Sequence, residues 1–263
     1  MVKQAQTLSS QYDLLLEKAK NILVLESIRS VILWDTDTKM PPKGIRLRSQ
    51  QLALLGQTDH KMCTDPEIGM LLEEIRKHPG YATLSHLQKR NVYLIKKKYD
   101  EMTKLPEKLV TETEKQRAIS GNIWKKAKAA KDFSMFKPEL EKLVDLRRKA
   151  AKILMKVKGT ATPYDALIDI FEPKMSSDEI SRIFEELKEG LVRIMKKCKS
   201  APKQPNASIL KRKVPIEVQR EIANSLVKFT KYDVDSKEAG GRIDETEHPF
   251  TSGYYDDVRI TTH

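Results

Sequence analysis

The side chains that most often bind catalytic metals are sparse in this sequence and do not cluster. It has five histidines, at positions 60, 78, 86, 248 and 263, and two cysteines, Cys63 and Cys198. No histidine is followed by glutamate and no two are four residues apart, so an H-E-x-x-H zinc helix is missing. The cysteines are too far apart for a zinc cluster or a disulfide framework. The residues alone therefore predict no metal site.

Signatures of other common chemistries are missing as well. The ten glycines form neither G-x-x-x-x-G-K-[ST] nor G-x-G-x-x-G, the loops that hold phosphate groups. No G-x-S-x-G turn presents a nucleophilic serine, although composition leaves a serine–histidine–aspartate arrangement open. The residues alone show no complete catalytic constellation.

Four segments are nevertheless unusual for a plain helical scaffold. Taken singly, each has a structural interpretation, because turn chemistry explains these residue types well. Trp34 would belong to the core, Asp35 and Asp37 would form a turn at a helix end, and His248 would lie in a loop before a proline. The segments are Trp34 to Pro42, Pro163 to Pro173, Gly241 to Phe250, and Asp257 to Thr262.

Taken together and in order, these segments form a set of motifs. They are W-D-x-x-x-x-M-P (Trp34, Asp35, Met40, Pro41), D-F-x-x-F-x-P (Asp132 to Pro138), P-Y-D-A-L-x-D (Pro163, Tyr164, Asp165 to Asp169), H-P-F (His248, Pro249, Phe250) and D-x-R-x-T (Asp257, Arg259, Thr261). The set resembles the carboxypeptidase Taq family of thermostable zinc metallocarboxypeptidases. The resemblance spans essentially the whole chain.

This resemblance implies a nearly all-helical, zincin-type metallopeptidase of about twice this length, with a groove and a small sheet beside the active site. In the family, an H-E-x-x-H helix and a later glutamate bind zinc shortly after the D-x-R-x-T strand. The chain ends at His263, where the family usually has arginine. We therefore expect the N-terminal portion of such an enzyme, with zinc as cofactor of the full-length family, no metal in this chain alone, and no activity alone. A split gene, a frameshift, a fragment and a complete pseudoenzyme all stay open.

The resemblance also gives expectations for the matched residues. Arg259 either grips the free carboxylate of a peptide C-terminus or pairs with Asp257, two residues away on the same strand face, and the second role is favoured. His248, held by Pro249, would donate a hydrogen bond in the groove or support a metal ligand, and Phe250 would pack below the site. Thr261 belongs to the same support. The W-D-x-x-x-x-M-P and P-Y-D-A-L-x-D residues are expected to be structural.

The charge of the chain raises the question of a nucleic-acid partner. Its 49 Lys and Arg against 37 Asp and Glu give a net charge of +12. Each basic cluster, such as Lys96 to Lys98 or Arg147 to Lys149, has acids nearby, which is typical of ion-pair networks on heat-stable proteins. No helix-turn-helix, stacking or zinc-finger motif occurs, so we expect no specific nucleic-acid binding. No membrane span or signal peptide is recognised, so a cytoplasmic location is expected.

Helical elements must position all these residues. Apolar residues follow the helical period over about 8–33, 45–60, 65–77, 84–102, 106–131, 138–156, 176–194 and 215–231. Asp65, Pro66 and Glu67 are typical of a helix start, and Ser176 with Glu179 predicts a capping box. From about 232 the sequence is rich in turn residues, and Val258 to Thr262 alternates as a strand does.

The sequence thus predicts a mainly α fold with a short C-terminal strand region. Residues 1–235 would form a helical domain, and residues 236–263 a loop and strand that begin an incomplete catalytic region. The leading function is the N-terminal portion of a carboxypeptidase acting on peptide C-termini. One alternative is a non-catalytic helical protein whose partner is the missing C-terminal half, a full-length homologue or a second copy. A basic nucleic-acid-binding module is the less favoured third.

Overall fold

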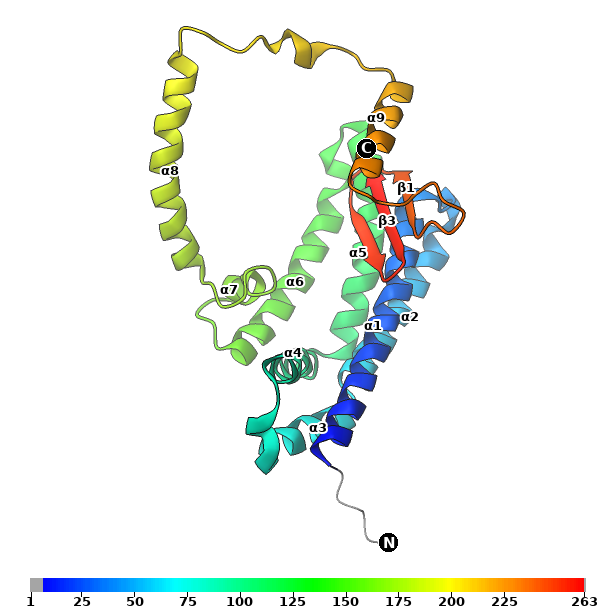
Figure 1. The fold of residues 1–263 in the computed structure, drawn as a ribbon, viewed down its shortest axis with the longest axis vertical. Coiled ribbons are helices and arrows are strands. Elements are labelled where there is room, and N and C mark those ends of the chain that lie inside the picture. Colours follow the sequence, from blue (N-terminus) through cyan, green and yellow to red (C-terminus); the bar gives the residue numbers. More distant parts are fainter. Residues whose placement is uncertain (1–6, 263) are drawn as a thin grey trace.

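A computed structural model describes residues 7–262 and shows long helices followed by one small sheet (Figure 1). This confirms the mainly α fold class. The helices are α1 Leu8–Thr38, α2 Ile45–Cys63, α3 Pro66–Lys77, α4 His86–Met102, α5 Glu107–Ala130, α6 Lys137–Lys158, α7 Pro163–Ile168, α8 Ser177–Ser200 and α9 Ile216–Phe229, with 3-10 turns at Pro42–Gly44, Pro79–Thr83, Phe133–Met135 and Ala207–Lys211. The strands are β1 Gly241–Glu245, β2 Thr251–Tyr254 and β3 Asp257–Thr262.

Local sequence explains where several helices begin. The Asp65 side chain accepts a hydrogen bond from the backbone N–H of Glu67, and Pro66 opens α3, as predicted. Ser85 and Gln88 form a reciprocal capping box at α4. These caps satisfy backbone N–H groups that a helix start otherwise leaves unpaired.

One local expectation needs correction. At α8, Ser176 accepts from the Glu179 N–H, but the reciprocal bond of the expected box is not formed. The first helix ends at Thr38, shortly before Pro41 and Pro42, so Trp34 lies inside its last turns. The segment between Pro163 and Pro173 begins with the short helix α7. Its Thr162–Asp165 capping box stabilises a helix too short for a periodicity signal.

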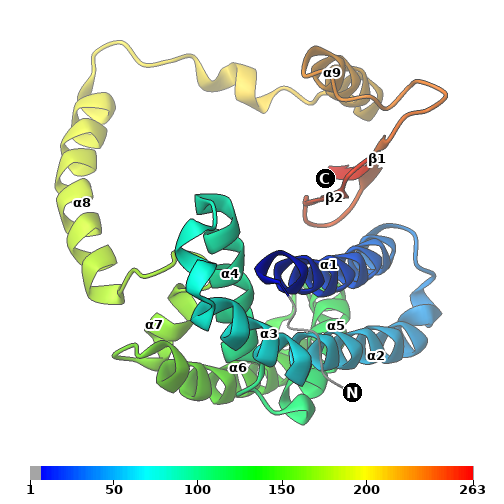
Figure 2. The same ribbon diagram turned by 60° about the horizontal axis from the view of Figure 1, so that its bottom comes forward.

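The hydrophobic core lies where α1, α3 and α4 meet, and the periodic side of α3 supplies much of it. Its buried residues are Tyr12, Leu15, Ile22, Cys63, Ile68, Leu71, Leu72, Ile75 and Val92. Beyond α1, α2 packs on α5, which packs on α6, so the helices form successive layers (Figure 2). The layers hold the C-terminal half of α1 in place.

After α7 the chain leaves these layers. Helix α8 has no buried residue, and neither has α9. The two helices and their connection form an open arc beside the layered body (Figure 2). The chain then returns to α1 through the sheet, whose strand order is β1-β3-β2.

Basic side chains on the surface are extensively paired with acids. Lys96 pairs with Asp100, Lys98 with Glu26, Lys125 with Asp37 at 2.7 Å and Lys149 with Asp145 at 2.7 Å. This pairing agrees with the surface ion-pair interpretation of the charge clusters. Within residues 7–262, every helix is too short or too polar to cross a membrane.

Candidate functional site

The sheet brings the two C-terminal motifs together. Strand β3 lies between β1, to which it is parallel, and β2, to which it is antiparallel. In this register Arg259 of β3 is paired with Arg242 of β1 and Ser252 of β2. Because side chains alternate across a strand, Asp257, Arg259 and Thr261 share one face of the sheet.

Two arginines of that sheet stack on one tryptophan of α1. The guanidinium carbon of Arg259 lies 4.3 Å from the centre of the Trp34 ring, and that of Arg242 lies 4.5 Å from it. Trp34 is only 6% exposed. A cation over an aromatic face is attracted by the ring quadrupole, more strongly where water is excluded. The stack therefore fastens the sheet to α1 across more than 200 residues of sequence.

Each arginine is also held by a carboxylate of its own strand. Arg259 donates from Nε to Asp257 Oδ1 at 2.8 Å and from Nη2 to Asp257 Oδ2 at 2.8 Å. Arg242 donates in the same way to Asp244, at 2.7 and 2.8 Å. These hydrogen bonds lower the pKa of both carboxyl groups and raise the pKa of both guanidinium groups. Asp244 is 6% exposed and also pairs with Lys39 at 3.1 Å.

The ion pair with Asp257 determines which N–H groups of Arg259 are left to bind a substrate carboxylate. A bidentate grip on a carboxylate uses two N–H groups on one edge of the guanidinium. The Nε–Nη2 edge of Arg259 is occupied by Asp257, and one face of the guanidinium lies against Trp34. This geometry is that of a brace between strand and helix.

Thr261 joins the D-x-R-x-T strand to the H-P-F segment. Its hydroxyl donates to the Phe250 carbonyl at 2.8 Å and accepts from the Phe250 N–H at 2.7 Å. Its own backbone N–H donates to the same carbonyl at 2.9 Å. Thr261 is buried, whereas His248 and Pro249 are exposed just before the joined position. The loop thus exposes His248 to solvent beside a position that three hydrogen bonds from Thr261 hold in place.

Phe250 and Met40 line one cavity between α1, α2 and α5. The cavity has a volume of about 380 Å³, and Leu52 and Asp37 also border it. The Thr246 hydroxyl donates to the Asp37 carbonyl at 3.1 Å, which ties the loop after β1 to the end of α1. The W-D-x-x-x-x-M-P, H-P-F and D-x-R-x-T motifs therefore form one assembly.

Asp35 has a role that turn chemistry did not predict. Its carboxylate accepts from Arg48 Nη2 of α2 at 2.5 Å. The same guanidinium donates through Nη1 to the Ile32 carbonyl at 2.8 Å and the Thr36 hydroxyl at 2.9 Å. Asp35 thus links α1 to α2, and Pro41 follows as the chain turns between them.

The Pro163 to Asp169 motif lies apart from this assembly, at the far end of α6 from the sheet (Figure 1). Asp165 accepts from the Thr162 hydroxyl at 2.7 Å and from the Ser177 N–H at 2.7 Å, so one carboxylate caps both α7 and α8. The backbone hydrogen bond from Ser177 is the main cause that lowers the pKa of Asp165 to about 2. Tyr164 is 67% exposed.

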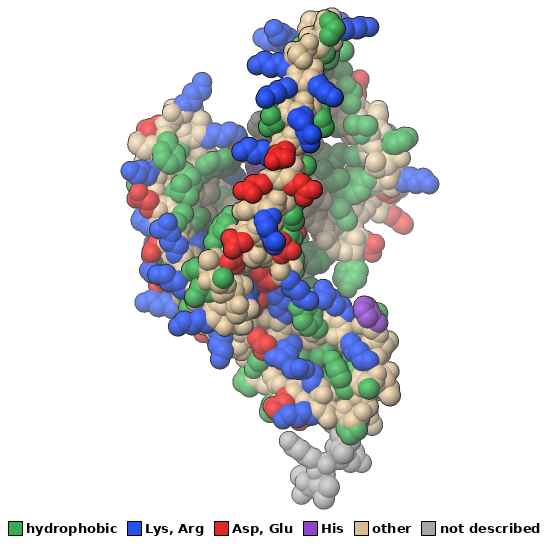
Figure 3. Space-filling view, turned by 90° about the vertical axis from the view of Figure 1, so that its left-hand side faces the viewer, with side chains coloured by type: hydrophobic (Ala, Val, Ile, Leu, Met, Phe, Trp, Pro, Cys, Tyr) green, Lys and Arg blue, Asp and Glu red, His purple; other side chains and the backbone are tan. Residues whose placement is uncertain are grey.

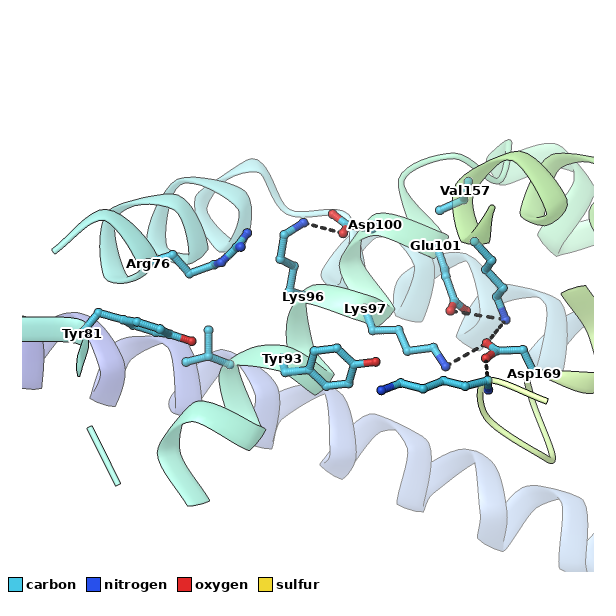
Figure 4. Close-up of a pocket in the computed structure, with 12 residues that line it drawn as sticks. Arg76, Tyr81, Tyr93, Lys96, Lys97, Asp100, Glu101, Val157 and Asp169 are labelled. Carbon is cyan, nitrogen blue, oxygen red and sulfur yellow. Dashed lines mark hydrogen bonds and ion pairs between the residues drawn. The ribbon is translucent and has the colours of Figure 1, made fainter. Parts of the chain in front are cut away.

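Asp169 is the last residue of this motif. It belongs to a network of ion pairs beside a cavity of about 470 Å³ (Figure 4). Its carboxylate lies 2.8 Å from Lys97 Nζ and 2.8 Å from Lys158 Nζ, and it accepts from the Lys174 N–H at 2.9 Å. Burial raises the pKa of Asp169, but the hydrogen bonds from Lys158, Lys97 and Lys174 together outweigh it, so the pKa lies well below its usual range. The network joins α4, α6 and the end of α7.

Sequence reasoning missed Arg242 and Asp244. They are an arginine and an aspartate two residues apart, the same spacing as Asp257 and Arg259 in reverse order. This repeated spacing was the feature of the sequence that could have pointed to Arg242 and Asp244. Its meaning depends on the strand register, which places the two arginines side by side.

Side chains of the types that bind metals are scattered over the described part of the chain. Within 7–262, no three His, Cys, Asp or Glu side chains lie close enough together to hold a metal ion. A catalytic zinc site takes three protein ligands.

Comparison with known proteins finds a metallopeptidase family that matches nearly the whole chain. The family described as carboxypeptidase Taq (M32) metallopeptidase matches residues 14–263. Thermostable carboxypeptidase 1 of Thermus thermophilus is 33% identical over 97% of this chain and 51% of its own length, and carboxypeptidase 1 of Bacillus subtilis is 31% identical over 87% and 44%. The solved structure of BsuCP has a TM-score of 0.87 at 28% identity, over 96% of this chain and 49% of that one. The chain spans about half the length of the curated relatives it matches.

Proposed function

This chain belongs to the carboxypeptidase Taq (M32) metallopeptidase family, and on that premise we propose that it is the N-terminal portion of a metal-dependent carboxypeptidase. Its substrates would be peptides with a free C-terminus. The observation that carries the proposal is the assembly of Trp34, the H-P-F loop and the D-x-R-x-T strand, joined by the Arg259 stack and the Thr261 hydrogen bonds.

The assembly suits a groove wall better than a complete catalytic centre. Arg259 braces the strand, because Asp257 and Trp34 occupy its edge and face. His248 is exposed in the H-P-F loop next to the braced strand, and it would donate a hydrogen bond to a substrate carbonyl or carboxylate. The family metal would polarise the scissile carbonyl and activate water when bound. Its ligands would come from the half of the relatives that this chain does not cover.

A peptide hydrolysis assay tests the proposal. The chain is combined with the uncovered half of the Thermus thermophilus relative, supplied with zinc and given a peptide with a free C-terminus or the same peptide with an amidated C-terminus. We expect release of the terminal amino acid from the free peptide only, loss of release with a chelator, and neither release nor stoichiometric zinc in the chain alone. A combined protein that binds zinc without releasing the residue, or a chain that does both alone, would contradict the proposal.

A second candidate is a non-catalytic protein that binds a partner, which would be the missing half, a full-length homologue or a second copy. The exposed apolar sides of α8 and α9 favour it. It is distinguished by partner binding without peptide hydrolysis. The paired basic clusters give no support to a nucleic-acid module.

A further inference from the structure

The cavity beside Asp169 is lined by more basic than acidic side chains (Figure 4). Its volume is about 470 Å³, which is in the range of small-molecule sites. The lining residues belong to α3, the turn that follows it, α4, α6 and the segment after α7, so this chain forms the cavity by itself. Three of them are acidic, and five are basic: Arg76, Lys96, Lys97, Lys158 and Lys174.

One side of the cavity is a buried and electrically neutral cluster. Asp169 lies 2.8 Å from the Nζ atoms of both Lys97 and Lys158, and Lys158 lies 3.4 Å from Glu101. The Lys158 side chain is 7% exposed and Asp169 is 8% exposed. Two lysines and two carboxylates thus cancel each other, and burial keeps them in place.

Two further cations of the cavity have no such compensation. Lys96 pairs with Asp100, which uses the third acid of the lining. Within residues 7–262, neither Arg76 nor Lys174 has a carboxylate partner. Positive charges in a concave site concentrate anions from solution. The net charge of +12 and the many basic side chains visible in Figure 3 attract anions to the whole chain, but only a cavity with uncompensated cations can hold one in a fixed place.

Lys174 is held in a backbone conformation that lysine rarely adopts. Its φ is +72°, in the left-handed region that is unfavourable for residues with a Cβ. Its N–H donates to Asp169 at 2.9 Å, and its Nζ lies 5.9 Å from the centre of the Tyr93 ring. Lys131 and Lys231 also have a positive φ, but they follow the ends of α5 and α9, where left-handed residues are common. Strain away from a helix end concentrates at ligand-binding positions.

We propose that this cavity binds a phosphate group, free or carried by a small molecule, with Arg76 and Lys174 as its charged donors. A guanidinium can donate two parallel N–H groups to phosphate oxygens, and an ammonium adds a compact positive charge. The hydroxyl group of Tyr93 is a further donor on the same cavity. The proposal goes beyond the proposed function and does not depend on it.

Isothermal titration calorimetry of the full chain with inorganic phosphate, at an ionic strength held constant with sodium chloride, tests the site. We expect one phosphate per chain. Lys174→Gly removes the ammonium and keeps the N–H that Asp169 accepts, so phosphate binding should weaken about tenfold or more, as it should with Arg76→Gln. Lys131→Gly is the matched control, because it removes a lysine with a left-handed backbone at the end of α5, outside the cavity, and should leave the affinity unchanged.

Chemical denaturation followed by circular dichroism checks the folding of the two glycine variants. Neither should have a lowered denaturation midpoint, because glycine adopts a positive φ without strain. A second titration with ribose 5-phosphate separates the two sources of the group: tighter binding than inorganic phosphate identifies a phosphorylated molecule and weaker binding the free ion, and both support the site. Absence of saturable binding of both ligands would overturn the proposal. Equal affinities of the Lys174→Gly and Lys131→Gly variants for phosphate would overturn it as well.

Discussion

Replacing Trp34 by alanine should release the sheet from α1. The side chain is 6% exposed, and truncation of a buried tryptophan costs about 3–5 kcal/mol in the free energy of unfolding. The contacts with Arg242 and Arg259 add about 0.5–1 kcal/mol each. We therefore expect a loss of about 4 kcal/mol or more, measured by chemical denaturation followed by circular dichroism.

Trp124→Ala is the matched control. Trp124 is half-buried and has a single cation contact, with Lys128 at 5.4 Å, so its loss should be about half as large. A double-mutant cycle of Trp34→Ala with Arg259→Ala isolates the stacking energy, for which we expect a coupling of about 0.5–1 kcal/mol. Equal losses for the two tryptophans, together with zero coupling, would refute the argument that Trp34 fastens the sheet.

Three further predictions follow from the structure. Thr261→Val removes the hydroxyl bonded to Phe250 and should destabilise the chain by about 1–3 kcal/mol, whereas Thr261→Ser should retain most of the stability; equal denaturation midpoints for the two variants would contradict this. Asp169 has a lowered folded-state pKa, so its contribution is fully present above its unfolded value of about 3.9 and is lost as pH falls through the folded pKa. Asp169→Asn should cost about 3 kcal/mol at pH 7 and flatten the loss of stability below pH 4, while Asp145→Asn on an exposed pair should do neither; a wild-type pH profile in the Asp169 variant would refute the network. Nucleic-acid binding, followed by fluorescence anisotropy, should be weak, independent of sequence and abolished by salt, and tight salt-resistant binding would contradict the paired-surface interpretation.

Local chemistry made much of the helical structure predictable. Helix α3 could be placed because Asp65 and Pro66 mark its start and its apolar residues repeat at helical spacing. The Asp257–Arg259 pair was predictable for a similar reason, since residues two apart share a strand face.

Contacts between distant segments were not predictable in the same way. Neither periodicity nor spacing relates Trp34 to Arg242, because their contact depends on how the sheet returns to α1. The roles of Asp35 and Asp169 also depend on partners in other helices, Arg48 and Lys158. Each carboxylate was recognisable as part of a motif, but its ion pair required the tertiary structure.

One substitution, made in the chain combined with its missing half, tests whether His248 lies in a substrate groove. His248 is exposed, so His248→Ala should leave the free energy of unfolding unchanged while lowering kcat/KM at least tenfold for a peptide with a free C-terminus. His86→Ala, at an exposed histidine that begins α4 away from the sheet, is the control and should change neither quantity. A tenfold loss confined to His248→Ala is the predicted result. Unchanged kcat/KM in that variant would contradict the claim that the braced sheet forms the groove of a carboxypeptidase.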